Sequence, residues 1–432
     1  MQKFLKWKEI SLPFFLFNIY IKMEIVNNRY TIQGLDLLDV ASEFGSPLYV
    51  YDAAKIGQQI ENMKAAFPGM KLKIKYACKS LTNISILKLI RAKGAELDTV
   101  SIQEVHLGLK AGFKPEEILF TPNCVSFDEI KAAVKLGVMI NIDNISILEQ
   151  FGHEYHNTVP VCIRLNPHIM AGGNKKISTG HVDSKFGISI FQIRHLHRVI
   201  ISNNINVIGL HMHSGSDILD AEVFLQGAEV LFEAAMDFPD LKFLDFGSGF
   251  KVAYREGDVT TDLQELGVKL SKAFKDFCKD YGRKLEIWFE PGKYIVSEAG
   301  YFLARTNVIK TTPATVFVGV ESGLNHLVRP MMYDSYHDIV NISNINGTKR
   351  IYTIVGYICE TDTFGLDRKL DEVHEGDIIA IKNAGAYGFM MSSNYNSRLR
   401  PAEVMIIDGK AKLIRQRESL EDLYKNQVEI DI

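Results

Sequence analysis

The run Ile74-Lys-Tyr-Ala-Cys-Lys79 is typical of a short β-strand, and Ser80-Leu-Thr-Asn83 directly after it has the character of a helix start. An amine at the carboxyl end of a barrel strand is well placed to form a Schiff base with a carbonyl cofactor. The alternative for Lys79 is a surface lysine that only marks the end of a strand. The choice between them depends on whether the strand-helix pattern repeats along the chain.

This pattern occurs eight times. The predicted strands are residues 74–79, Glu96–Ser101, Ile118–Pro122, Val138–Asp143, Val161–Asn166, Val207–His213, Phe243–Gly249 and Leu285–Pro291. The first five begin 20 to 23 residues apart, which is close to the minimum for one strand, one helix and two loops. Repeated β-α units form parallel sheets, and eight of them favour an α/β fold closed into a TIM (β/α)8 barrel.

Capping signals mark several of the expected helices. Ser101 with Glu104, and Ser126 with Glu129, fit the capping-box pattern, and glycines follow the expected helix ends. The last three strand-to-strand spacings lengthen to 46, 36 and 42 residues. We therefore expect longer loops in that half of the barrel, where a substrate would bind.

After Gly300 the sequence changes to short β-rich runs separated by turns. They are Tyr301–Lys310, Ala314–Val320, Lys349–Ile358, Asp377–Ile381 and Glu403–Ile407. We predict a (β/α)8 barrel over residues 57–304 and a C-terminal antiparallel β domain over residues 305–432. The strands expected within residues 23–56 would join the β domain.

Residues 1–22 fit neither domain. The apolar stretch Leu12–Ile21 resembles a signal-peptide core, but Glu9 interrupts the basic region before it and no small-residue cleavage site follows. Met23 looks like a natural start. We expect residues 1–22 to be a disordered leader or an upstream extension of the reading frame.

Composition is that of an ordinary cytoplasmic enzyme. The chain has 432 residues, is 47% hydrophobic and carries a net charge of −3, so it gives no reason to expect nucleic acid as a partner. Its five cysteines are odd in number and lack CxxC spacing, which favours reduced thiols over disulfides or structural zinc. No apolar run is long enough to cross a membrane, so we expect no membrane partner.

Chemically useful residues gather at the ends of the later strands. His211 and His213 would face the same way on the sixth strand, but no third ligand with sensible spacing accompanies them, so we expect no metal. The glycine-containing loop 247–249 after the seventh strand could hold a phosphate. Glu290 after the eighth strand could keep a pyridine nitrogen protonated. Together with Lys79 these features predict a pyridoxal phosphate site.

Four blocks resemble the fold-type III pyridoxal phosphate-dependent decarboxylases. They are Tyr76-Ala-Cys-Lys79, Gly209-Leu-His-Met-His-Ser-Gly-Ser216, Glu290-Pro-Gly-Lys293 and Cys359-Glu360. The segment from Gly385 to Glu403 is most similar to the branch of this family that acts on meso-2,6-diaminopimelate, and the resemblance extends from about residue 30 to 415 in order. It implies decarboxylation of meso-2,6-diaminopimelate to L-lysine and CO2, the last step of lysine biosynthesis.

The resemblance also implies roles for individual residues. Lys79 would bind the cofactor covalently and His213 would stack on its ring. The remaining cofactor contacts would come from Ser216, Gly249, Glu290, Pro291, Gly292, Lys293 and Tyr387. The substrate would contact Lys293, Arg329, Tyr333, Glu360 and Tyr387. Cys359 resembles the family's proton donor, which is supplied across the interface of a homodimer with shared active sites.

Two positions depart from the family pattern. The family usually has three glycines where this chain has Gly247-Ser248-Gly249, so the loop is expected to approach the phosphate less closely. It usually has arginine at the position of Lys293, and lysine keeps the charge but loses the bidentate fork. Neither departure removes a group that bond breaking needs.

The residue types suit the reaction. A protonated ring takes up the electrons left by loss of CO2, and Glu290 would maintain that proton. A thiol such as Cys359 can then protonate the α-carbon. The alternative for Cys359 is a buried cysteine with a role in packing alone, which the adjacent Glu360 disfavours.

Three other functions stay open. A sister decarboxylase acting on ornithine, arginine or carboxynorspermidine would share the whole barrel. A racemase of the same fold would need a tyrosine base from the second domain in place of the thiol. A non-catalytic homologue that only binds pyridoxal phosphate would more readily have lost Lys79 or Cys359.

Overall fold

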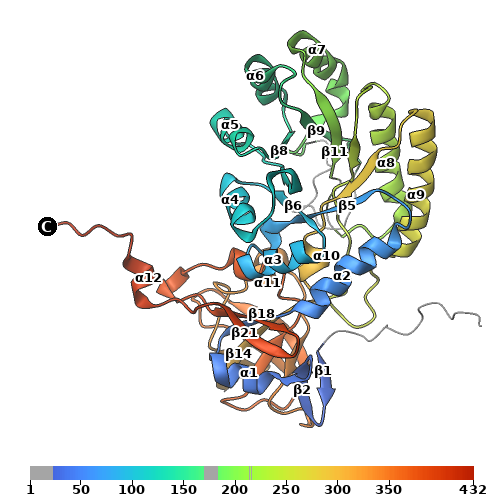
Figure 1. Cartoon of the computed structure of the whole chain (residues 1–432). Coiled ribbons are helices and arrows are strands. Elements are labelled where there is room, and N and C mark those ends of the chain that lie inside the picture. Colours follow the sequence, from blue (N-terminus) through green and yellow to red (C-terminus); the bar gives the residue numbers. More distant parts are fainter. Residues whose placement is uncertain (1–22, 170–182, 214, 216) are drawn as a thin grey trace, which may run out of the picture.

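The computed structural model describes residues 23–169, 183–213, 215 and 217–432. The leader predicted at 1–22 and the predicted phosphate contact Ser216 lie outside the described residues. Figure 1 shows a barrel ringed by helices above a second, β-rich part that contains the early strands as well as the late ones. Among the described residues, no helix is long and apolar enough to cross a membrane.

The eight predicted barrel strands are all present and all parallel. They are β5 (Leu72–Ala77), β6 (Glu96–Thr99), β7 (Ile118–Phe120), β8 (Met139–Ile142), β9 (Val161–Asn166), β11 (Val207–Met212), β12 (Phe243–Asp245) and β13 (Glu286–Phe289). Pairing of β13 with β5 and of β8 with β9 closes the barrel. A short additional strand, β10 (Ile188–Ser189), pairs with β9.

The β12 strand is shorter than predicted. It ends at Asp245 because Gly247 and Gly249 take positive φ values of 61° and 118°, which no extended strand accommodates. The residues after Asp245 therefore form a loop over the end of the barrel, where the sequence had suggested continued strand.

Helices surround the barrel. They are α2 (Ala53–Ala66), α3 (Ile84–Ala92), α4 (Ile102–Ala111), α5 (Phe127–Lys135), α6 (Ile145–Tyr155), α7 (Ile193–Asn203), α8 (Ala221–Ala235), α9 (Leu263–Asp280) and α10 (Lys293–Val296). Ser101 caps α4 by accepting from the Glu104 amide at 3.2 Å. The capping box is incomplete, because the Glu104 carboxylate accepts from the Val100 amide instead of the Ser101 amide.

The second part of the molecule is a mixed β-sheet. Its strands are β4 (Leu48–Asp52), β14 (Gly300–Thr311), β15 (Val316–Val320), β16 (Ile339–Asn341), β17 (Lys349–Val355), β18 (Thr363–Asp371), β19 (Ile378–Ile381), β20 (Ala402–Ile407) and β21 (Lys410–Arg415). Most pairs are antiparallel, as predicted, but β15 with β17 and β20 with β4 run parallel.

Short elements complete this region. A separate small sheet contains β1 (Glu24–Val26), β2 (Arg29–Ile32) and β3 (Leu35–Asp36), and it leads into α1 (Leu37–Phe44). Two further helices belong to this part of the chain, α11 (Arg329–Tyr333) between β15 and β16, and α12 (Leu420–Tyr424) after β21. Because β4 pairs with both β14 and β20, a strand from the N-terminal fifty residues stands inside the late sheet.

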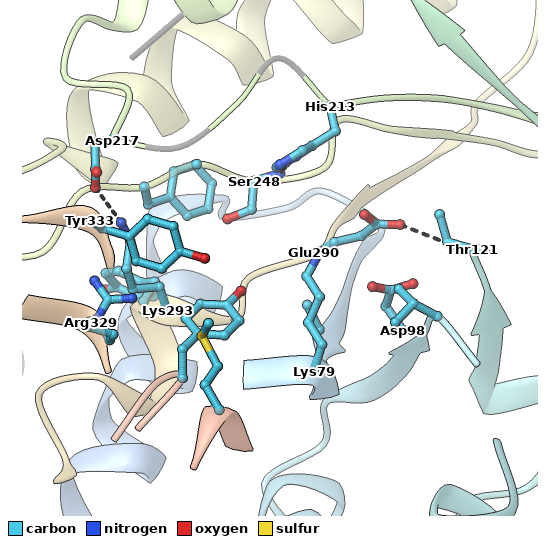
Figure 2. A pocket seen from close by; sticks show the side chains of 18 of the residues that line it. Lys79, Asp98, Thr121, His213, Asp217, Ser248, Glu290, Lys293, Arg329 and Tyr333 are labelled. Carbon is cyan, nitrogen blue, oxygen red and sulfur yellow. Dashed lines mark hydrogen bonds and ion pairs between the residues drawn. The ribbon is translucent and has the colours of Figure 1, made fainter. Parts of the chain in front are cut away.

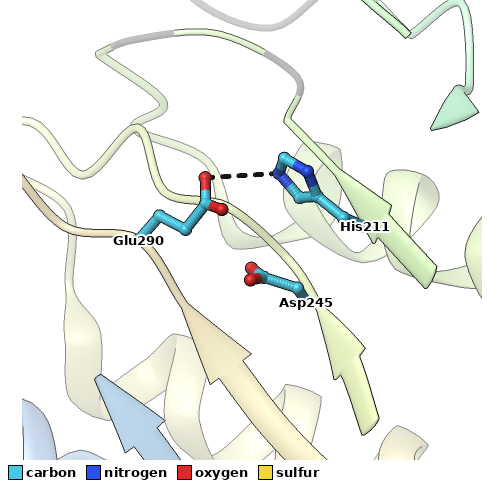
Figure 3. Close-up of side chains that lie close together, drawn as sticks. All are labelled: His211, Asp245 and Glu290. Atoms are coloured by element: carbon cyan, nitrogen blue, oxygen red, sulfur yellow. Dashed lines mark ion pairs between the residues drawn. The ribbon is translucent and has the colours of Figure 1, made fainter. Parts of the chain in front are cut away.

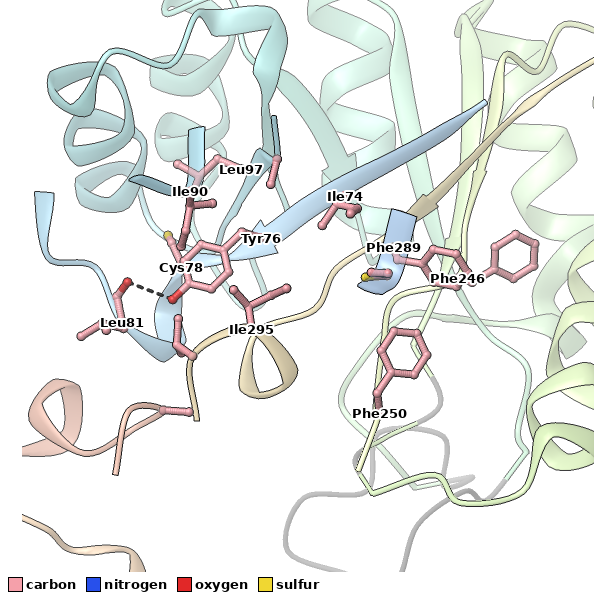
Figure 4. Close-up of a cluster of buried hydrophobic side chains, with 14 of the residues drawn as sticks. Ile74, Tyr76, Cys78, Leu81, Ile90, Leu97, Phe246, Phe250, Phe289 and Ile295 are labelled. Carbon is pink, nitrogen blue, oxygen red and sulfur yellow. Dashed lines mark hydrogen bonds between the residues drawn. The ribbon is translucent and has the colours of Figure 1, made fainter. Parts of the chain in front are cut away.

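The barrel core fixes the turn that carries Lys79. Figure 4 shows Ile74 and Tyr76 of β5 among the buried side chains of this core. The Tyr76 hydroxyl donates to the Leu81 carbonyl at 3.0 Å, and the Ser80 hydroxyl donates to the Ala77 carbonyl at 2.9 Å. These bonds stabilise a 3-10 turn over Cys78–Ser80. The backbone of Lys79 is therefore held in a tight turn between two buried residues.

Candidate active site

A single cavity of about 720 Å³ lies at the carboxyl ends of the barrel strands, under the edge of the β domain (Figure 2). Most of the predicted site residues line it, namely Lys79, His213, Gly249, Glu290, Gly292, Lys293, Arg329, Tyr333 and Tyr387. Pro291 does not line the cavity, and its backbone carbonyl accepts a hydrogen bond from the Ala77 amide at 3.2 Å. The structure thus brings together side chains from both domains.

Lys79 projects into this cavity and is exposed (Figure 2). Protein surrounds the cavity closely enough to desolvate the amine, and burial on its own lowers the pKa of Lys79. Attraction by Tyr387, Asp98 and Glu290 outweighs that effect, so the pKa of Lys79 lies above its ordinary value. Of these neighbours Glu290 is the ionised acid, so the amine lies near a negative charge in the position that a covalent anchor needs.

Glu290 is the ionised acid of the site. Burial alone would raise the pKa of Glu290, but contact with His211, followed by His213 and Arg164, lowers it below the ordinary value. Burial also lowers the pKa of His211, so this histidine is neutral at pH 7. Its Nε2 lies 3.3 Å from Glu290 Oε2, a close polar contact that lacks the geometry of a regular hydrogen bond. A carboxylate with this charge suits a protonated pyridine nitrogen.

His213 is neutral as well. Burial and then the charges of Arg164 and Lys79 lower the pKa of His213 well below its ordinary value. The Ser248 amide donates to His213 Nδ1 at 3.2 Å, which leaves the ring proton on Nε2. The imidazole faces the cavity as a flat, uncharged ring (Figure 2).

The loop after β12 requires its outer glycines. A Cβ on Gly247 would lie 2.5 Å from His213 Nδ1, and one on Gly249 would lie 2.4 Å from the Gly215 carbonyl oxygen. The middle residue has no such restriction, and the Ser248 side chain lines the cavity. The chain therefore keeps the two glycines that close approach demands and departs from the family pattern only where a side chain fits.

Cationic side chains stand at the far end of the cavity. Arg329 is 8% exposed, its Nη2 donates to the hydroxyls of Tyr254 and Ser335 at 3.3 Å each, and its Nε has no hydrogen-bond partner among the described residues. Lys293 Nζ lies 2.5 Å from Asp217 Oδ1. Arg329 contacts only neutral hydroxyls in these bonds, so its charge is available to a ligand carboxylate, whereas that of Lys293 is neutralised.

Cys359 and Glu360 lie outside this cavity. Both are exposed, in the segment between β17 and β18. The Tyr395 hydroxyl donates to Glu360 Oε1 at 2.7 Å, and Asn396 Nδ2 lies 3.4 Å from Cys359 Sγ. The structure does not bring either residue to the site of its own chain, so any role for them there requires a second subunit.

Several cavity residues were not predicted from the sequence. They are Asp98, Thr121, Arg164, Asp217, Tyr254 and Tyr336. Asp98 and Arg164 lie inside β6 and β9, and an ionisable residue within a barrel strand was the signal that could have found them. The partners of His211 were also missed, since ligand atoms of His211, Asp245 and Glu290 lie within 4.8 Å of one another and His213 is not part of this group.

A family model and several relatives match this chain. A family model described as "Pyridoxal-dependent decarboxylase, pyridoxal binding domain" matches residues 53–297. Diaminopimelate decarboxylase of Methanothermobacter thermautotrophicus is 37% identical, with 92% of this chain and 95% of the relative covered. The structure of diaminopimelate decarboxylase from M. jannaschii in complex with L-lysine is 31% identical, covers 94% of this chain and 98% of its own, and superposes with a TM-score of 0.85.

A lysine/ornithine decarboxylase structure from Vibrio vulnificus is more distant. It is 22% identical over 87% of this chain and 98% of its own, with a TM-score of 0.75. At that identity the likeness concerns the fold alone.

Proposed function

This chain belongs to the fold-type III pyridoxal phosphate-dependent decarboxylases and, within them, to the diaminopimelate decarboxylases, and from that premise we propose how its own residues carry out the reaction. The enzyme is a carboxy-lyase that converts meso-2,6-diaminopimelate to L-lysine and CO2. The observation that carries the proposal is one cavity in which an amine, an ionised acid, a glycine loop and a free guanidinium converge.

The residues present fit pyridoxal phosphate. Lys79 would hold it covalently, the loop Gly247–Gly249, whose Ser248 and Gly249 line the cavity, would hold the phosphate, and Glu290 would face the ring nitrogen. When bound, this cofactor supplies an electron sink for the pair left by loss of CO2. Glu290 would maintain the proton on the ring nitrogen because its pKa is lowered, whereas the pKa values of Asp98 and Asp245 are raised.

The substrate carries a second amine and a second carboxylate far from the bond that breaks. Arg329 would bind that distal carboxylate, helped by Tyr333, because its guanidinium is desolvated and contacts only neutral hydroxyls. The role of Lys293 is then secondary, since Asp217 already neutralises it at 2.5 Å. A diamine precursor such as ornithine offers nothing to Arg329, which disfavours the sister activities.

Cys359 and Glu360 would act in the site of a second subunit. We propose a homodimer in which Cys359 of one protomer supplies the proton for the α-carbon in the other site, and Glu360 binds the distal amine of the substrate. Their exposure and their distance from the cavity of their own chain support this arrangement. In a C2 dimer the same exchange completes both sites.

Other expectations from the sequence stay proposals. We place the boundary between the barrel and the β domain near residue 304, inside β14, and keep residues 1–22 as a leader that catalysis does not need.

All five cysteines are free thiols, which fits the reducing cytoplasm in which we propose that the enzyme works.

The test is to incubate purified protein with pyridoxal phosphate and a panel of amino acids while CO2 release is followed. Turnover of meso-diaminopimelate is expected to exceed that of lysine, ornithine and arginine. Faster decarboxylation of ornithine or arginine would contradict the assignment and favour the sister decarboxylases. Absence of CO2 release from every substrate would favour a non-catalytic homologue.

A further inference from the structure

Glu290 belongs to a cluster of three buried acids at the end of the barrel. Asp98 on β6 and Asp245 on β12 are the other two, and His211 on β11 completes the group. Ligand atoms of His211, Asp245 and Glu290 lie within 4.8 Å of one another (Figure 3). Asp98 lines the same cavity as Glu290 and lies below it in Figure 2.

The three acids do not share their charge equally. Burial, followed by the charge of Glu290, raises the pKa of both Asp98 and Asp245 well above the ordinary value, which favours the neutral form of these two acids. Glu290 makes a close contact with a histidine, since its Oε2 lies 3.3 Å from His211 Nε2, although this contact lacks regular hydrogen-bond geometry. In a buried cluster, a donor to one carboxylate favours ionisation of that acid over its neighbours.

Asn141 determines which ring nitrogen of His211 carries the proton. Its Nδ2 lies 2.7 Å from His211 Nδ1 and 3.4 Å from Thr121 Oγ1. Because an amide nitrogen can only donate, Nδ1 is the acceptor and the imidazole proton lies on Nε2, facing Glu290. Thr121 Oγ1 in turn lies 3.5 Å from Glu290 Oε1, so this small network reaches both oxygens of the carboxylate.

We propose that His211 is a positioning residue that fixes the negative charge of the cluster on Glu290 and orients this carboxylate toward the cofactor's ring nitrogen, with Asn141 holding its tautomer. His211 lies behind Glu290 and does not line the cavity, so it acts through Glu290 and not on the substrate. The inference rests on the pyridoxal phosphate site of the proposed function and adds to it the residues that prepare Glu290.

Two variants of one position separate the proposed role from simple packing. His211→Leu keeps bulk and removes the N–H, whereas His211→Gln retains an amide N–H near the position of Nε2. Each apoprotein is titrated with pyridoxal phosphate and with its analogue in which CH replaces the ring nitrogen. The analogue has no proton for Glu290 to hold, so it is a matched control for cofactor shape and phosphate contacts.

His211→Leu is expected to weaken pyridoxal phosphate binding by ~10- to 100-fold and to leave binding of the analogue within about threefold of wild type. His211→Gln should recover most of the lost affinity. Asn141→Leu provides a second route if His211→Leu fails to fold, and it should show the same selectivity for the nitrogen-containing ring.

Equal losses for pyridoxal phosphate and the analogue would mean that His211 only packs, and wild-type affinity in His211→Leu would mean that it does not act on Glu290; either result overturns the proposal. These affinities do not depend on which amino acid is decarboxylated. A failure here therefore remains distinguishable from a wrong substrate assignment.

Discussion

Replacing Arg329 with alanine is expected to damage turnover of diaminopimelate far more than it alters cofactor binding. The guanidinium is 8% exposed and its observed partners are the neutral hydroxyls of Tyr254 and Ser335. Leaving the distal carboxylate of the substrate without this charge-assisted partner should cost about 2–4 kcal/mol, which is ~30- to 1,000-fold in kcat/KM.

Arg329 is expected to contribute more than Lys293 to binding of the distal substrate carboxylate. Lys293 already pairs with Asp217 at 2.5 Å, so a substrate carboxylate must compete for it, whereas Arg329 has no such anionic partner in its observed bonds. Arg329→Lys should recover only part of the loss because an ammonium cannot offer the planar fork. Tyr254→Phe is the matched control, since it removes one neutral hydroxyl and retains the guanidinium, and it should cost about 1 kcal/mol or ~5-fold.

The assay measures kcat/KM for meso-diaminopimelate and the dissociation constant of pyridoxal phosphate on the same preparations. A selective loss of kcat/KM in Arg329→Ala supports binding of the distal carboxylate by Arg329. The reasoning is refuted if cofactor affinity falls by the same factor as kcat/KM, or if Tyr254→Phe is as damaging as Arg329→Ala.

Four further predictions concern the anchor, the dimer, the leader and pH. Lys79→Ala should abolish both the visible absorbance of the bound cofactor and the borohydride-reducible adduct, and persistence of both would identify another lysine as the anchor. Mixing inactive Lys79→Ala with inactive Cys359→Ala should restore about a quarter of wild-type activity through random pairing, with one intact site per mixed dimer; no recovery despite proven subunit exchange would exclude shared sites. A protein that begins at Met23 should be as active as the full chain, while export that depends on the leader would favour a signal peptide. For Asp245, burial raises the folded-state pKa, so its stabilising contribution is complete below the unfolded pKa of about 3.9 and is lost as pH rises toward the folded pKa. The unfolding free energy of Asp245→Asn relative to wild type should therefore increase as pH rises above about 4, and a difference that is flat with pH would show that Asp245 is already ionised in the fold.

The sequence was sufficient for the barrel and for residues at strand ends. Lys79 and Glu290 follow strands that periodicity predicts, and parallel strands bring their carboxyl ends to one rim. Their convergence in one cavity follows from that rule and needs no knowledge of side-chain packing.

Contacts between distant segments could not be predicted in this way. Lys293 and Asp217 are 76 residues apart, and their ion pair depends on how two loops fold over the rim. Strand β18 was missed because its sequence, Thr363-Phe-Gly-Leu-Asp-Arg-Lys-Leu-Asp371, contains four charged residues and a glycine. Its pairing with β17 stabilises it instead. The place of Cys359 depends on a second subunit, which no pattern within one chain reveals.

The pairing of Asn141, His211 and Glu290 shows a similar limit. The sequence predicted that His211 and His213 face the same way on the sixth strand and that they bind no metal. In the fold His213 faces the cavity, whereas His211 faces Glu290 and does not line the cavity. Strand β11 ends at Met212, so His213 lies beyond it and the alternation of faces along a strand does not apply to this pair.

The most direct test of the central claim is the product formed from meso-diaminopimelate by the wild-type enzyme loaded with pyridoxal phosphate. The substrate has two carboxylates attached to centres of opposite hand, so the enantiomer of lysine reports which one leaves. We predict one L-lysine for each CO2 released. Formation of D-lysine, or CO2 release without lysine, would contradict the account.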